Sequence, residues 1–114
     1  MPFKAEGKNA MLDALGALVT HASLYTDDTA VTEVTGGTYA REAITWAAAS
    51  GGSIASSNQP AFDVPASTTV KAVGFMSALT EGTQHAYHNV TDEVFAGAGT
   101  YTLTSANLTI TDPV

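Results

Sequence analysis

The sequence predicts a mainly β protein, an antiparallel β-sandwich with one N-terminal α-helix. Two patterns predict this class. Apolar residues recur at three- and four-residue steps over residues 6–19, the spacing of one helix face. After them come short Thr-rich runs with Val, Ile, Tyr and Phe, separated by Gly, Pro, Asn and Asp, which is typical of strands and turns.

Length and composition favour one ordered domain. The chain has 114 residues, of which 45% are hydrophobic and 13% charged, enough apolar content for a single core and too much for a disordered linker. We expect a single domain over residues 1–114, with an arm over residues 1–5, a helix over 6–19 and the β-sandwich over 20–112. Residues 112–114 are expected to form a second arm that becomes ordered on binding.

The predicted helix carries its large apolar residues on one face: Met11, Leu12, Leu15, Leu18 and Val19. Gly7 and Gly16 weaken it by about 1 kcal/mol each relative to Ala. We therefore expect the apolar face to dock on a sheet and to stabilise the helix by packing.

Ten candidate strands follow the helix, and we expect two of the shorter ones to be loops. They cover residues 20–25, 31–35, 38–46, 53–57, 61–64, 69–78, 85–90, 93–95, 100–104 and 107–111. Residues 69–78 are apolar on both faces, which predicts a central strand. Residues 39–49 mix Ala with Ile, Thr and Trp, and the Gly-rich turns on either side favour a strand.

The residue pattern also predicts that two of the candidate strands pair. In residues 100–104 and 107–111, apolar side chains alternate with threonines, so each run has one apolar and one hydroxylated face. With residues 105–107 as the turn, the two runs predict a hairpin. Pro60 and Pro65 enclose residues 61–64, which predicts an edge strand.

The charge balance excludes several classes of partner. Four Lys and Arg stand against eleven Asp and Glu, giving a formal net charge of −7, which repels nucleic acid and anionic lipid. The sequence also has no apolar run of the roughly 18 residues that a membrane span needs. We expect neither a nucleic-acid nor a membrane partner. The chain has no cysteine, so disulfides and thiolate chemistry are excluded.

Candidate metal ligands are few. His85 and His88 lie three residues apart, which places them on opposite faces of a strand unless a bulge intervenes. The acidic pairs Asp27–Asp28 and Asp92–Glu93 could bind Ca²⁺ with help from backbone carbonyls, but they lack the alternating spacing of an EF-hand. We interpret the acids as turn residues and expect no metal site.

No catalytic frame emerges from the sequence. There is no G-x-S-x-G or S-x-x-K motif, and the glycine-rich segments lack the Lys and following helix of a phosphate loop. We expect no catalytic residue and no cofactor.

The remaining candidates are interface residues. The aromatic residues expected in the core are Trp46, Phe62, Phe75, Phe95 and Tyr101. Because arms and strand-borne aromatic or Arg side chains commonly anchor interfaces, the predicted interface residues are Phe3, Lys4, Tyr39, Arg41 and Trp46. A solvated sheet face is the alternative interpretation of Arg41 and Glu42.

Four motifs follow one another over nearly the whole chain: GKNAMLDALG, EVTGGTYAREAITWAAASGGS, FDVPASTTVKAVGF and FAGAGTYTLTSANLTI. Their order resembles a family of small structural proteins of tailed bacteriophages, especially those of actinobacteria, described as capsid-associated or tail-fibre-like. The chain departs from the family pattern at residues 76–90, where a Gly-rich turn is expected. The resemblance implies a non-enzymatic virion component with a helix packed on a β-sandwich.

Three functions compete at this stage. The first is a capsid decoration or minor capsid protein that binds the outside of the phage head, with the major capsid protein and further copies of itself as partners. The second is a tail or tail-fibre component. The third is a small hydrolase or a carbohydrate-binding module. The module is weakened because such modules present a planar row of aromatics and the chain has one Trp. The head exterior is the preferred location of the three, after synthesis in the host cytoplasm.

Overall fold

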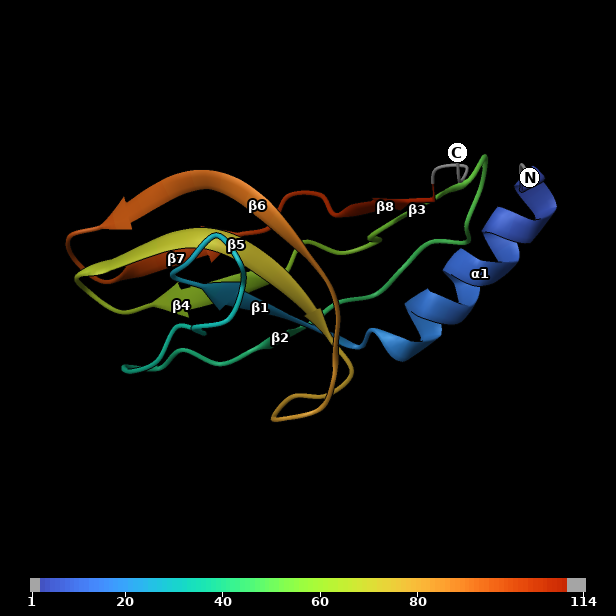
Figure 1. Ribbon diagram of the computed structural model, residues 1–114. Coiled ribbons are helices and arrows are strands. Elements are labelled where there is room, and N and C mark those ends of the chain that lie inside the picture. The colour runs from blue at the N-terminus through green and yellow to red at the C-terminus, as the bar shows by residue number, and fades with distance from the viewer. Residues whose placement is uncertain (1–2, 111–114) are drawn as a thin grey trace.

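The computed structural model describes residues 3–110, which form one helix and eight strands (Figure 1). Residues 1–2 and 111–114, which include parts of both predicted arms, lie outside the described residues. The elements are α1 (Ala5–Leu18), β1 (His21–Tyr25), β2 (Glu42–Ala43), β3 (Ser53–Ala55), β4 (Ala61–Val64), β5 (Thr68–Met76), β6 (Gln84–Phe95), β7 (Gly99–Thr102) and β8 (Asn107–Thr109).

The main sheet has four antiparallel strands in the order β2, β1, β5, β6. β5 lies between β1 and β6, and its last five residues are all buried. This placement confirms the prediction of a central strand, because only a strand covered on both faces can bury consecutive side chains.

Two smaller antiparallel pairs, β4 with β7 and β3 with β8, complete the β-structure. Phe62 of β4 is fully buried and shares one apolar cluster with Leu24 of β1 and Val73 of β5. The β4 side of the molecule therefore forms a second layer over the main sheet. The mainly β, antiparallel class with a single N-terminal helix is confirmed for the described residues.

The predicted C-terminal hairpin is wrong. β7 pairs with β4, where Tyr101 lies opposite Phe62, and β8 pairs with β3, where Leu108 lies opposite Ile54. The alternation of apolar and Thr side chains set the faces of both strands correctly, but it carried no information about the partner strand.

Four other predicted strands differ. Residues 31–35 are a loop with one bridge, between Tyr25 and Glu33, and residues 38–46 contribute the two-residue β2 and one bridge at Trp46. The runs 85–90 and 93–95 are parts of the single strand β6. The register of β6 against β5 shifts twice, so its two halves do not share one alternating pattern.

The helix docks by one side of its predicted apolar face. Leu12 is buried and Leu15 half-buried, whereas Met11 and Leu18 are 39% and 54% exposed. Two polar side chains fasten the same side: Asn9 Oδ1 accepts a hydrogen bond from the backbone N–H of Gly52 at 3.0 Å, and Asp13 Oδ1 accepts one from Ala49 at 2.9 Å. Docking on the β3 side, at the end of the molecule (Figure 1), leaves the rest of the helix in solvent.

Gly74 of β5 allows a close approach of side chains from β1. A Cβ at this position would lie 2.5 Å from Tyr25 Cε2 and 2.8 Å from Ser23 Oγ. The fully buried Ser23 hydroxyl donates to the Tyr25 hydroxyl at 3.1 Å, and the Tyr25 hydroxyl donates to Met76 Sδ at 3.4 Å. Tyr25 is itself 4% exposed, so it has no room to move aside.

The substitution Gly74→Ala is expected to lower the free energy of unfolding by about 1–3 kcal/mol, because the added methyl overpacks this site. Chemical denaturation measures the change. Gly97→Ala is the matched control, since a Cβ at Gly97 meets nothing within 4 Å, and it should change stability by less than about 0.5 kcal/mol. Equal effects of the two substitutions would contradict the packing described for Gly74.

Candidate functional site

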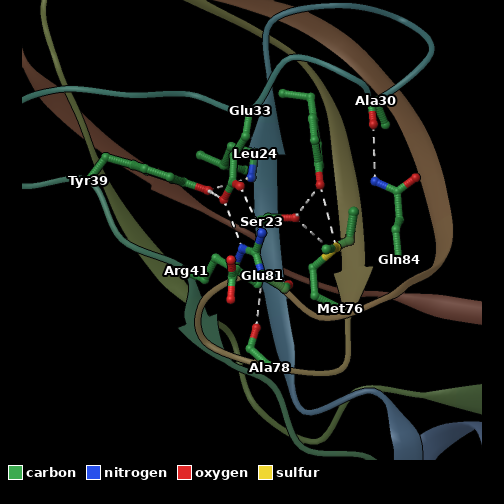
Figure 2. Close-up of polar contacts among 12 residues, drawn as sticks. Ser23, Leu24, Ala30, Glu33, Tyr39, Arg41, Met76, Ala78, Glu81 and Gln84 are labelled. Atoms are coloured by element: carbon green, nitrogen blue, oxygen red, sulfur yellow. Dashed lines mark hydrogen bonds and ion pairs between the residues drawn. The ribbon is translucent and has the colours of Figure 1, made fainter.

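Two of the predicted interface residues, Tyr39 and Arg41, belong to a polar cluster that also contains Glu33; these three residues are called the Glu33 cluster. Arg41 Nε donates to Glu33 Oε2 at 3.0 Å and Arg41 Nη2 donates to Oε1 at 2.9 Å, a bidentate ion pair (Figure 2). The Tyr39 hydroxyl donates a third hydrogen bond to Oε2 at 2.8 Å. The carboxylate of Glu33 is thus held from two sides.

The Glu33 cluster connects segments that are distant in the sequence. Arg41 Nη1 donates to the carbonyl oxygens of Ala78 at 3.0 Å and Glu81 at 2.7 Å, both in the loop between β5 and β6. The Tyr39 hydroxyl accepts the backbone N–H of Leu24 in β1 at 2.9 Å. Figure 2 shows these contacts converging on one point beside β1. One carboxylate therefore organises three parts of the chain.

Burial determines the electrostatics of the cluster. The side chains of Arg41 and Glu33 are 10% and 25% exposed, so solvent screens their attraction less than it screens a surface pair. The hydrogen bond to Glu33 raises the pKa of Arg41, and burial raises the pKa of Tyr39 well above its ordinary value. At neutral pH Arg41 is charged and Tyr39 keeps its proton, as the observed bonds require.

An open groove of about 470 Å³ lies against the cluster. Tyr39 and Arg41 form part of its wall, and Leu79, which is 52% exposed, lies on the opposite loop. The donor groups of Arg41 are engaged within the chain, so the groove presents mostly apolar side chains and backbone to solvent. Its chemistry suits packing against another surface.

Trp46 lies elsewhere, beside α1. Its Nε1 donates to the carbonyl oxygen of Val19 at 3.1 Å, and its ring lies 5.9 Å from that of Phe75 at an interplanar angle of 56°. With Ile54 it lines a second groove of about 550 Å³ along the helix. A Cβ on Gly16 would lie 2.9 Å from Ile54 Cδ1, so glycine lets the helix approach this wall.

Phe3 and Lys4 precede the helix and are exposed. Lys4 is the N-cap residue of α1 and makes no side-chain capping bond, while its carbonyl oxygen accepts the N–H of Lys8 at 3.0 Å. The five predicted interface residues thus lie in three places: before the helix, beside it, and in the Glu33 cluster. That they contact a partner stays a prediction.

Glu33 was not predicted as the partner of Arg41. A neighbouring subunit or solvent was expected to face Arg41, whereas the structure pairs Arg41 within the chain. The signal was weak but present, since Glu33 and Arg41 are opposite charges eight residues apart in a segment with few charges. Because the intervening residues are largely irregular, no periodicity linked the two positions.

Asp27, from the acidic pair that follows β1, has a local structural role. Asp27 accepts hydrogen bonds from Thr29 Oγ1 at 2.5 Å and from the backbone N–H groups of Val31 and Thr32 at 3.0 and 2.9 Å. The bond from Thr29 is the largest of the causes that lower the pKa of Asp27. Asp27 therefore closes the turn after β1, in agreement with its interpretation as a turn residue.

The two histidines of β6 lie near a β-bulge, the exception that the sequence analysis allowed for their placement on opposite faces. A register shift between Phe75 and Met76 makes His85 a bulge residue, so its spacing to His88 no longer fixes opposite faces. Even so, residues 3–110 contain no group of three or more His, Cys, Asp or Glu side chains placed to hold a metal ion. Within the same residues, no helix is both long and apolar enough to cross a bilayer.

Tyr39→Phe should weaken the fold at neutral pH by about 1–2 kcal/mol, since the N–H of Leu24 and the Glu33 carboxylate each lose a partner. Burial raises the pKa of Tyr39 above the unfolded value. The stability that the Tyr39 hydroxyl contributes to the fold is therefore complete below pH ~10, and it declines at higher pH by at most ~1.4 kcal/mol per pH unit. The stability difference between wild type and variant should therefore narrow above pH ~10 in chemical denaturation.

Tyr87→Phe is the matched control, because Tyr87 is 49% exposed on β6. It should leave both the neutral stability and its decline at high pH unchanged. Burial also raises the pKa of Tyr101, so Tyr39→Phe should retain part of the decline. A constant difference between wild type and Tyr39→Phe at all pH values would contradict the buried phenol.

Comparison with known proteins indicates the same class of protein as the sequence motifs. No curated protein and no solved structure matches the chain. A family model described as "Podophage GP4 fiber I protein gp80" matches residues 9–111, which span α1 from its middle to the end of β8. This agrees with the resemblance to structural proteins of tailed phages. The chain belongs to the podophage GP4 fiber I protein gp80 family and is a structural protein of a bacteriophage particle.

Proposed function

We propose that the chain is a non-enzymatic structural module of a phage tail fibre. The observation that carries the proposal is the family match over residues 9–111, whose description names a fiber protein. A match over nearly the whole chain indicates that the family's role belongs to this fold rather than to a small motif within it.

The geometry supports a structural role. The Glu33 cluster joins β1 to the β5–β6 loop, and all three of its side chains are engaged in hydrogen bonds within the chain. All buried side-chain nitrogen and oxygen atoms of the described residues have a hydrogen-bond partner. The buried polar groups of these residues thus make hydrogen bonds within the fold.

The proposal replaces the location preferred from sequence. The head exterior was favoured on composition and size, which suit many virion proteins equally, whereas the family description names the fiber. The proposed partners are accordingly tail proteins and further copies of the chain. That the family belongs especially to phages of actinobacteria stays a prediction.

The test removes the gene from the phage that encodes the chain and compares the particles produced. If the chain is a fibre component, the particles should contain filled heads with unchanged resistance to heat and chelators, and should adsorb to host cells more slowly. Adsorption assays and the thermal release of DNA measure the two properties separately.

Complementation supplies the controls. Wild-type protein should restore adsorption, and so should Lys71→Ala, which removes only an exposed ion pair of 3.9 Å to Asp92. Particles that release DNA at lower temperature while adsorbing normally would contradict the fibre proposal and support decoration of the head. Quantitative mass spectrometry gives the copy number relative to the major capsid protein: near parity would likewise contradict a fibre.

A further inference from the structure

The loop over residues 26–32, called the 26–32 loop, covers the face of the main sheet that points away from the second layer. Its Ala30 forms a small buried cluster with Tyr25 and Ala72, separate from the main core. Val73, the neighbour of Ala72, packs in the main core, and adjacent residues of a strand point to opposite faces. The loop is therefore a cover over the outer side of β1 and β5.

Two connections join the 26–32 loop to the β5–β6 loop, which spans residues 77–83. At the tip, the carbonyl oxygen of Ala30 accepts a hydrogen bond at 3.1 Å from Nε2 of Gln84, the residue that follows the β5–β6 loop (Figure 2). Directly after the 26–32 loop, Glu33 forms the ion pair with Arg41, which also binds two carbonyl oxygens of the β5–β6 loop. Displacement of one loop alone breaks at least one of these connections.

Neither loop has the packing to hold its conformation alone. Ala30 is the one buried residue of the 26–32 loop, and none of the described residues 77–83 is buried. Ala30 and Glu81 have φ angles of 54° and 55°, in the left-handed region that disfavours residues with a Cβ. Segments with few buried side chains and a strained backbone open at a low free energy. Each loop therefore gains order from its connections to the other.

We infer that the 26–32 loop and the β5–β6 loop open and close as one unit, while the strands beneath them stay folded. Opening uncovers Tyr25, which is 4% exposed in the closed state. It also widens the groove of about 470 Å³, because the β5–β6 loop forms one wall of that groove. The two loops are thus a conformational device that exposes the outer face of the main sheet in one step. The inference is independent of the position of the chain in the particle.

Residue-resolved amide hydrogen exchange tests the inference with one substitution in each loop. Thr29→Val removes a hydroxyl that donates within the 26–32 loop, and Ser77→Ala removes the hydroxyl that accepts the N–H of Thr83 in the β5–β6 loop. Losing one hydrogen bond makes the shared opening easier, so Thr29→Val should raise the exchange rates of the Ser77 and Thr83 amides roughly fivefold. Reciprocally, Ser77→Ala should raise the exchange rates of the Val31 and Thr32 amides by a similar factor.

Thr45→Val is the matched control, because the exposed Thr45 hydroxyl bonds to Ser57 Oγ at 2.7 Å, outside both loops. It should leave the exchange rates in both loops unchanged. The amide of Leu103, which donates to the carbonyl oxygen of Pro60 at 2.9 Å, should exchange at the wild-type rate in the two loop variants. A rise confined to the substituted loop would overturn the inference. An equal rise at Leu103 would also overturn it, since the loops would then open through unfolding of the whole chain.

Discussion

The ion pair between Glu33 and Arg41 is the interaction on which the arrangement of this chain depends most. Between β1 and β3 the chain runs for 27 residues with just the two residues of β2 in a strand, so backbone pairing holds this segment through β2, two bridges and isolated hydrogen bonds and not through a continuous ladder. The bidentate pair, the Tyr39 hydroxyl and two carbonyl oxygens of the β5–β6 loop provide the missing connections. Removing one partner of such a pair leaves a poorly solvated charge, which makes its loss costly.

The rest of the structure divides into a densely buried centre and an end that is held by fewer contacts. At the centre, β5 buries side chains against both layers, and Gly74 admits the Tyr25 ring across it. At the end, α1 rests on the β3 side through Leu12, Leu15 and two side-chain bonds. The centre explains how a chain without disulfides is held together. The family match makes the chain a virion protein.

Local patterns predicted the elements better than their partners. The strand over residues 61–64 has the predicted bounds, because Pro60 and Pro65 fix both ends, and the helix is displaced by one residue. Pairing was predicted wrongly for β7 and β8, whose partners β4 and β3 lie far back in the sequence, since alternation specifies a face and not a neighbour. Tyr39 and Arg41 of the Glu33 cluster were predicted as interface residues from their types, and that role stays a prediction. Glu33 was missed because the irregular segment between it and Arg41 has no periodicity that links the two positions.

A double-mutant cycle on Glu33 and Arg41 tests the central role of the ion pair most directly. The free energy of unfolding is measured for wild type, Glu33→Gln, Arg41→Gln and the double variant, and the same cycle is made with Lys71 and Asp92, an exposed pair at 3.9 Å. The account predicts a coupling energy above about 1.5 kcal/mol for Glu33 and Arg41 and below about 0.5 kcal/mol for the exposed pair. A coupling for Glu33 and Arg41 no larger than that of the exposed pair would contradict it.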